Sequence, residues 1–178
     1  MINAYKIAEM VKKGNVGGAI DTAEILAICE RHILSTRIKT VKKVAKRAAR
    51  HCVFTDGELW YFTDMVMAFA LKLPLPIEDK GERIYEIIKI INNAYENTRL
   101  RGAPPIPVCI DDLNAHIDDS RKAPYRLGDH HLCPKRLRAA LVILGGNISA
   151  YLPESNRNVV YLESENGCAV VCPLRRVG

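Results

Sequence analysis

Lysine and arginine side chains gather in one stretch of the chain at the spacing that places them on one side of a helix. On a helical wheel they share an arc, and no Asp or Glu interrupts them. The residues are Lys39, Lys42, Lys43, Lys46, Arg47 and Arg50. Val41, Val44 and Ala45 lie on the opposite arc, so the helix can dock on a sheet and present a uniformly positive face to phosphate groups. A solvated helix face is the alternative, but mixed charges would serve solubility better.

A second basic cluster begins the helix that the pattern predicts over 134–144. Lys135, Arg136 and Arg138 follow Pro134, so they lie where the helix macrodipole is already positive. This arrangement destabilises a helix unless an anion binds there. Contacts of this kind read no bases. We therefore expect backbone binding to DNA that is independent of sequence and weakened by salt.

Two further clusters could in principle bind a metal. A zinc site could use His130, His131 and Cys133 with Asp129, or with Cys168 and Cys172, but the spacing matches no common zinc pattern. Magnesium for phosphodiester hydrolysis could use Asp111, Asp112, Asp118, Asp119 and Asp129. Because most of these carboxylates lie in a proline-rich stretch, we interpret them as solvated loop charges. They could also shield the basic faces or mimic phosphate toward another protein.

The remaining composition restricts the class of protein. Lys and Arg (26) outnumber Asp and Glu (20), which gives a net charge of +6 and favours a polyanionic partner. The six cysteines form no CxxC pair, which indicates reduced thiols and a cytoplasmic protein. No apolar leader or membrane-spanning stretch is apparent, and no phosphate-loop, dinucleotide-binding, GxSxG or HExxH motif occurs. We expect no catalytic residue, no metal, no cofactor and no membrane partner.

Hydrophobic periodicity and turn residues predict an α+β fold. Helices are expected over 3–14, 21–34, 39–50, from 79 through Tyr95, and 134–144. Strands are expected over 51–54, 59–62, 66–73, 125–127, 148–152, 159–162 and 168–174. Residues 99–124, rich in proline, are expected to form a long irregular connection with a short strand at 108–110. Trp60 and Phe62 should share one side of their strand and Tyr61 the other.

The order of elements repeats within the chain. Segments 37–73 and 125–174 each contain a basic helix followed by three short strands. Asp56-Gly57-Glu58-Leu59 followed by Thr63-Asp64 is similar to the "dG-x-L... aTD" segment of bacterial DNA polymerase III β sliding clamps. Residues 159–163 and 169–175 resemble the last strands and the terminal tail of those clamps. The resemblance covers roughly 38–73 and 125–175.

This resemblance implies a domain of two helix-plus-three-strand halves whose helices face DNA. In the family, a pocket formed partly by the C-terminal tail receives short peptide motifs of partner proteins. The matching residues here are Val171, Cys172, Pro173, Leu174 and Arg175, although three further residues follow them. A bacterial clamp chain has three such domains and this chain has room for one, so a ring would require a homo-oligomer.

We therefore expect a helical N-terminal extension over 1–35 and a clamp-like α+β domain over 36–178 with an insertion at 75–124. The expected function is that of a noncatalytic DNA-associated protein, an accessory factor for replication or repair in a phage or mobile element. Two alternatives remain open. One is an inhibitor or regulator that binds a nucleic-acid-processing protein, such as a host defence nuclease, and blocks its DNA site. The other is a metal-dependent nuclease.

Overall fold

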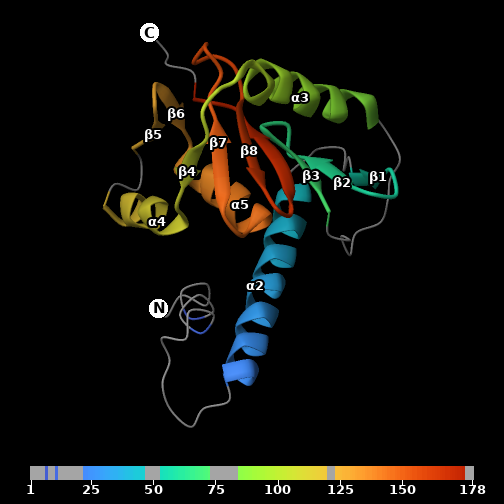
Figure 1. The fold of residues 1–178 in the computed structure, drawn as a ribbon, viewed down its shortest axis with the longest axis vertical. Coiled ribbons are helices and arrows are strands. Elements are labelled where there is room, and N and C mark those ends of the chain that lie inside the picture. The colour runs from blue at the N-terminus through green and yellow to red at the C-terminus, as the bar shows by residue number, and fades with distance from the viewer. Residues whose placement is uncertain are drawn as a thin grey trace.

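A seven-stranded sheet with the strand order β1-β2-β3-β9-β8-β7-β4 forms the centre of the molecule (Figure 1). The computed structural model describes residues 22–46, 53–72, 84–119 and 123–174, together with positions 7 and 11. All neighbouring strands of the sheet pair antiparallel. A separate hairpin consists of β5 (Tyr125–Leu127) and β6 (His130–Leu132). The expected α+β class is confirmed.

Six of the seven strands come from two meanders of the same form. Helix α2 (Thr22–Ala45) precedes β1 (Val53–Thr55), β2 (Trp60–Thr63) and β3 (Met67–Leu71). Helix α5 (Pro134–Leu144) precedes β7 (Ile148–Tyr151), β8 (Val160–Ser164) and β9 (Gly167–Val171). Because β3 pairs with β9, the two meanders lie in the order that a twofold axis between these strands would generate.

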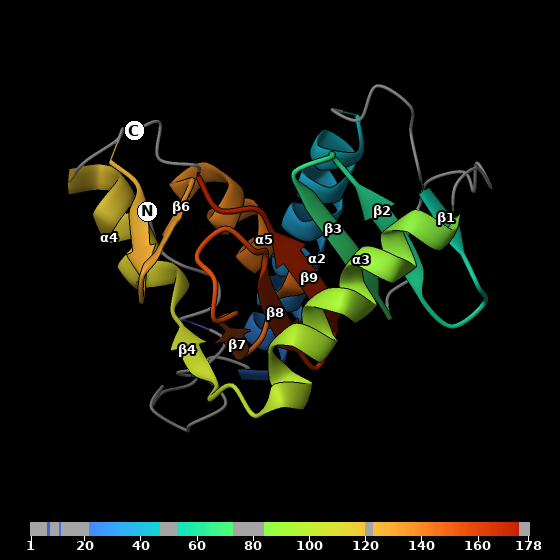
Figure 2. The same ribbon diagram turned by 90° about the horizontal axis from the view of Figure 1, so that it is seen from above.

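Helices cover both faces of the sheet. Helix α3 (Ile84–Asn97) crosses one face, while α5 and the C-terminal half of α2 lie on the other (Figure 2). Successive residues of a strand point to opposite faces, so β2 contributes to two cores. Phe62 packs into the core shared with α2 and α5, and Tyr61 packs into the core shared with α3. Trp60 packs on the same side as Phe62, as expected.

The two hairpin turns of the first meander use the same Thr-Asp arrangement. A side-chain oxygen of Asp56, and likewise of Asp64, accepts the backbone amides two and three residues further on at 2.8–3.1 Å. The residue after each aspartate has a positive φ, +98° at Gly57 and +71° at Met65. Residues that resemble the clamp motif thus also hold these turns, and the turns set the register of β1, β2 and β3.

The N-terminal part of the fold differs from expectation, because α2 is one continuous helix rather than two. No Gly or Pro interrupts it. Thr36 and Thr40, at the expected break, keep their hydroxyl groups satisfied within the helix by donating to the carbonyls four residues back, at 2.9 and 2.8 Å. The helix crosses residue 36, where we expected a domain to begin. Its N-terminal half projects beyond the sheet (Figure 1). The expected helix over 3–14 and residues 47–50 of the basic helix lie outside the described residues, apart from positions 7 and 11.

The expectation of an irregular connection over 99–124 is wrong for most of this segment. It contains a 3-10 turn, Arg99–Arg101, strand β4 (Ile106–Val108) and helix α4 (Ile110–Asp119). The strand precedes the expected 108–110 and includes Pro107, which is tolerated because β4 is an edge strand. In α4, Ile110, Leu113 and Ile117 recur at helical spacing and pack on the core to which α5 also contributes. The expected insertion at 75–124 therefore contributes strand β4 and helices α3 and α4 to the fold.

Candidate nucleic-acid interface

The C-terminal half of α2 has an apolar side against the sheet and a basic side in solvent. Val41 and Val44 are 2 % and 1 % exposed, whereas the lysines on the other side are exposed. These lysines are Lys39, Lys42 and Lys43 of the helix and Lys46, which directly follows its last residue and whose amide still donates to the carbonyl of Lys42 at 3.1 Å. The predicted amphipathic arrangement is confirmed for this part of the helix; Arg47 and Arg50 lie outside the described residues.

The four lysines of α2 have no carboxylate partner among the described residues. Ion pairs between described residues, such as Arg99 with Glu163 and Arg126 with Asp129, lie on other elements. Like charges three or four residues apart on a helix repel each other by a few tenths of a kcal/mol per pair. Binding an anion would relieve this repulsion, so the lysine face favours a polyanionic ligand.

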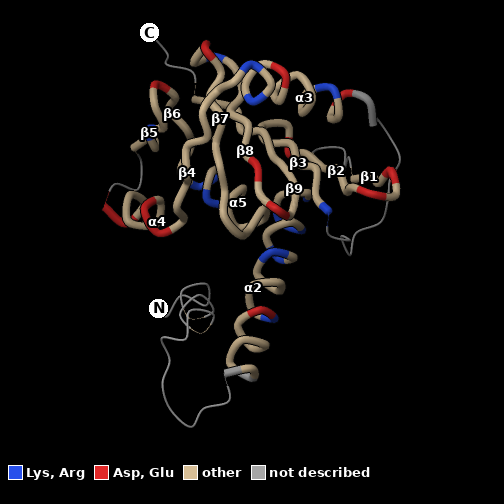
Figure 3. Tube along the Cα trace, viewed as in Figure 1, with Lys and Arg blue, Asp and Glu red and all other residues tan. Residues whose placement is uncertain are grey.

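The N-terminus of α5 is also basic. Cys133 precedes the helix without a side-chain cap, Pro134 occupies its first turn, and no acidic residue is present there. Lys135 and Arg138 are exposed and Arg136 is half-buried. Helices α2 and α5 contact each other on the same face of the sheet, and Lys and Arg appear on both in Figure 3. The fold thus places the helices that carry the two basic clusters on one face of the sheet. The side-chain hydrogen bonds between these helices lie at the C-terminal end of α5, away from its basic N-terminus.

An acidic helix limits this surface on one side. Helix α4 contacts α5, and its exposed Asp111, Asp112, Asp118 and Asp119 appear in red in Figure 3. These four carboxylates are therefore helical rather than loop charges, while Asp129 lies in the turn between β5 and β6. The Nε of Arg138 donates to Oδ1 of Asn114 on α4 at 2.7 Å. Arg138 is thereby held toward the acidic helix, and the lysines of α2 form the more uniformly positive part of the surface.

A buried arginine that we did not identify from the sequence joins the two basic helices. Arg37 of α2 is 9 % exposed, and its guanidinium donates to the carbonyls of Ile143 and Leu144 at 2.9 and 3.1 Å. These carbonyls end α5, where the helix macrodipole is negative, so the cation is favourable there. The clue in the sequence is position: Arg37 falls on the same stripe as Val41 and Val44, the side that packs against the sheet.

The C-terminal residues expected to receive a partner lie in different environments. Val171 is fully buried in β9, Cys172 and Pro173 are half-buried, and Leu174 is 38 % exposed. The amide of Cys172 donates to Val66 at 3.0 Å and that of Leu174 to His131 at 2.7 Å. Arg175 lies outside the described residues. Two cavities lined by described residues lie elsewhere, beside His130 and beside α3.

The side chains considered as a zinc site do not share one face of the β5–β6 hairpin. His130 and His131 are consecutive in β6, so their side chains point to opposite faces. Within residues 22–46, 53–72, 84–119 and 123–174, no three His, Cys, Asp or Glu side chains converge as metal ligands. In the same described ranges, no helix has both the length and the apolar composition needed to cross a membrane.

Comparison with known proteins found no matching family model, no similar curated protein and no similar solved structure.

Proposed function

We propose that this protein is a noncatalytic DNA-associated protein that binds the phosphate backbone through the basic face of α2 and α5. The observation that supports it best is the row formed by Lys39, Lys42, Lys43 and Lys46, which are exposed and lack carboxylate partners among the described residues. Arg37 holds this helix against α5, so the charges are displayed on a rigid surface. Rigid, closely spaced cations match a rigid polyanion at a low cost in conformational entropy.

We further propose that the two helix-and-meander units are the halves of a single clamp-like domain. The support is their common order, the central pairing of β3 with β9, and the contact between α2 and α5 on one face. A ring around DNA would then need several copies of the chain, acting as a replication or repair accessory factor in a phage or mobile element. Multi-angle light scattering tests this directly: a ring requires an oligomer, and a monomer at working concentrations refutes it.

DNA binding is tested with two quadruple charge-reversal variants of the full chain. The first changes Lys39, Lys42, Lys43 and Lys46 to Glu. The control changes four other exposed residues, which lie outside α2 and α5, to Glu: Lys72, Lys89, Arg101 and Arg157. Both variants lower the net charge from +6 by the same amount, so any difference between them reports position rather than total charge. Circular dichroism verifies that each variant is folded.

We expect the α2 variant to lose retention on duplex DNA and the control variant to keep most of it. The logarithm of the wild-type association constant should fall with the logarithm of salt concentration with a slope of about −3 to −4 if four lysines contact phosphates. Affinity should vary little with DNA sequence. Equal retention of the two variants, or no retention of the wild-type chain at low salt, would refute the proposal.

A second function is favoured by α4, which displays four exposed carboxylates on a ten-residue helix. Regularly spaced carboxylates can imitate phosphate groups, so α4 could occupy the DNA site of a nucleic-acid-processing protein. Such an inhibitor would protect duplex DNA from a nuclease at salt concentrations where the chain itself is not retained on DNA. Changing Asp118 and Asp119 to Lys should then abolish protection, whereas the α2 variant should not.

A further inference from the structure

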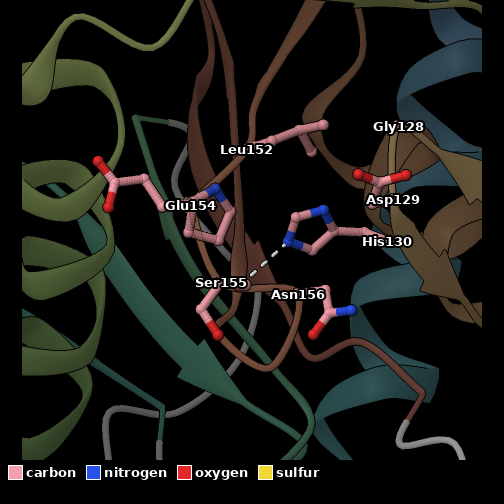
Figure 4. Close-up of a pocket in the computed structure, with 8 residues that line it drawn as sticks. Gly128, Asp129, His130, Leu152, Glu154, Ser155 and Asn156 are labelled. Carbon is pink, nitrogen blue, oxygen red and sulfur yellow. Dashed lines mark hydrogen bonds between the residues drawn. The ribbon is translucent and has the colours of Figure 1, made fainter.

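A cavity of about 440 Å³ lies between the β5–β6 hairpin and the loop after β7. The hairpin contributes Gly128, Asp129 and His130, and the loop contributes residues 152–156 (Figure 4). The two walls meet closely: Gly128 has φ +56°, and a Cβ there would lie 2.7 Å from Cδ1 of Leu152. A larger residue at position 128 would have to displace the Leu152 side chain and adopt a positive φ, so the backbone of the hairpin turn itself forms part of the wall.

His130 offers an unused hydrogen-bond acceptor in this wall. Its side chain is 3 % exposed, and its Nε2 lies 3.3 Å from the carbonyl oxygen of Ser155. Because a carbonyl can only accept, Nε2 is the ring nitrogen that donates, and Nδ1 of the neutral ring has a free lone pair. Nδ1 is buried and has no hydrogen-bond partner within the described residues. Figure 4 shows it directed away from Ser155, toward Asp129 and Leu152.

The rim of the cavity is negative although the chain as a whole is positive. Asp129 and Glu154 are both exposed at the lining, on opposite walls. Arg126 contacts Asp129 at 3.3 Å, but the two side chains are 70 % and 87 % exposed. An exposed ion pair of this kind is weak, so another cation can compete with Arg126 for Asp129. The cavity thus combines a buried acceptor with anionic groups at its entrance.

We propose that this cavity binds a cationic N–H donor, either a guanidinium or a primary ammonium group. One N–H of the ligand donates to Nδ1 of His130, and its charge lies near Glu154 and Asp129. An anionic ligand would be repelled by the two carboxylates, an uncharged ligand would gain nothing from them, and a ligand without a donor would leave Nδ1 unsatisfied, at a cost of about 1–3 kcal/mol. The source is either a free small amine or a basic side chain of another protein.

Nuclear magnetic resonance of the full chain labelled with ¹⁵N tests the proposal. The probes are agmatine, a free small cation, and N-acetyl-arginine amide, which stands for an arginine in a protein; N-acetyl-glutamate amide is the negative control. We expect agmatine to shift the Nδ1 resonance of His130 and the amides of 128–130 and 152–156. His131, on the opposite face of the same strand, is the internal reference and should not shift. Binding of both cations indicates a site open to side chains, and binding of agmatine alone indicates a site for free amines.

Matched variants separate this site from general attraction of cations. The double variant Asp129→Asn with Glu154→Gln should bind agmatine about fivefold more weakly or worse, because it removes both charges at the entrance. The control, Asp118→Asn with Asp119→Asn, removes two exposed charges from α4 and should bind as the wild type does. The His130→Gln variant can still donate to Ser155 but has no acceptor at the place of Nδ1, so its affinity should also fall. Equal affinity of all variants, or no shift with either cation, would overturn the proposal.

Discussion

Replacing Arg37 with Met should remove the polar bridge between α2 and α5 while keeping an apolar side chain of similar length. A hydrogen bond from a charged donor to a buried carbonyl contributes about 1.5–3 kcal/mol. The carbonyl of Ile143 would lose such a bond, whereas that of Leu144 also accepts the side-chain amide of Asn166 at 2.9 Å and would be partly compensated. A buried cation at a helix C-terminus adds up to about 2 kcal/mol.

We therefore expect Arg37→Met to lower the free energy of unfolding by about 2–4 kcal/mol, a large part of the stability of a typical domain. Urea unfolding of the full chain, followed by far-ultraviolet circular dichroism, measures this change. With a slope of about 2 kcal/mol per molar urea, the midpoint should fall by about 1–2 M.

Arg31→Met is the matched control. Arg31 lies on the same helix but is exposed, and its Nε donates only to the carbonyl of Ala27 four residues back, at 3.3 Å. Its replacement should change the free energy of unfolding by no more than about 0.5 kcal/mol. If Arg37→Met is no more destabilising than Arg31→Met, the assignment of Arg37 as the link between the two helices is wrong.

Three further predictions concern the sheet and its turns. Gly167→Ala should lower the free energy of unfolding by about 3 kcal/mol or more, because the new Cβ would lie 2.1 Å from a backbone carbonyl oxygen of β3. Gly102→Ala is the control in the same urea assay. Gly102 has φ +84° but lies in open space, so its replacement should cost about 1 kcal/mol. Met65→Gly should stabilise by up to about 1 kcal/mol, because Met65 is 79 % exposed and held at φ +71°; a loss of stability would contradict this. Burial, with a hydrogen bond to the carboxylate of Asp56, raises the pKa of Tyr61 to about 12 from the 10.0 of an unperturbed tyrosine. The contribution of Tyr61 to stability should therefore be complete below pH 10 and be lost as the pH rises toward 12, and Tyr61→Phe should remove this part of the pH dependence.

Local patterns predicted the elements whose stability depends on nearby residues. The helix over 134–144 begins with Pro134 and ends before Gly145, as its sequence indicates. The first hairpin follows from its Asp56-Gly57 turn, and the alternation of Trp60, Tyr61 and Phe62 across the sheet follows from strand geometry. The exposure of the lysines of α2 was predictable because helical periodicity alone places them opposite Val41 and Val44.

Elements that depend on distant partners were missed. Proline-rich spacing favours a loop, yet β4 forms because β7 offers an edge with which it can pair. Helix α4 forms because its apolar stripe packs on the core that it shares with α5. Strand β6 is short and polar in part, and its register with β5 depends on the turn at Gly128 and Asp129. Local propensity is a weak guide in such segments because tertiary contacts supply most of their stability.

The sequence by itself determined the net positive charge, the amphipathic basic helix and the repeated order of helix and strands, since each depends on residue type and short-range periodicity. Only the tertiary structure decided that the helices carrying the two basic clusters contact each other on one face of the sheet, that Arg37 is buried between these helices, and that His130 faces an acidic cavity. These features join residues far apart in the chain, and such contacts are specified by the pairing of β3 with β9 and the packing of helices on the sheet.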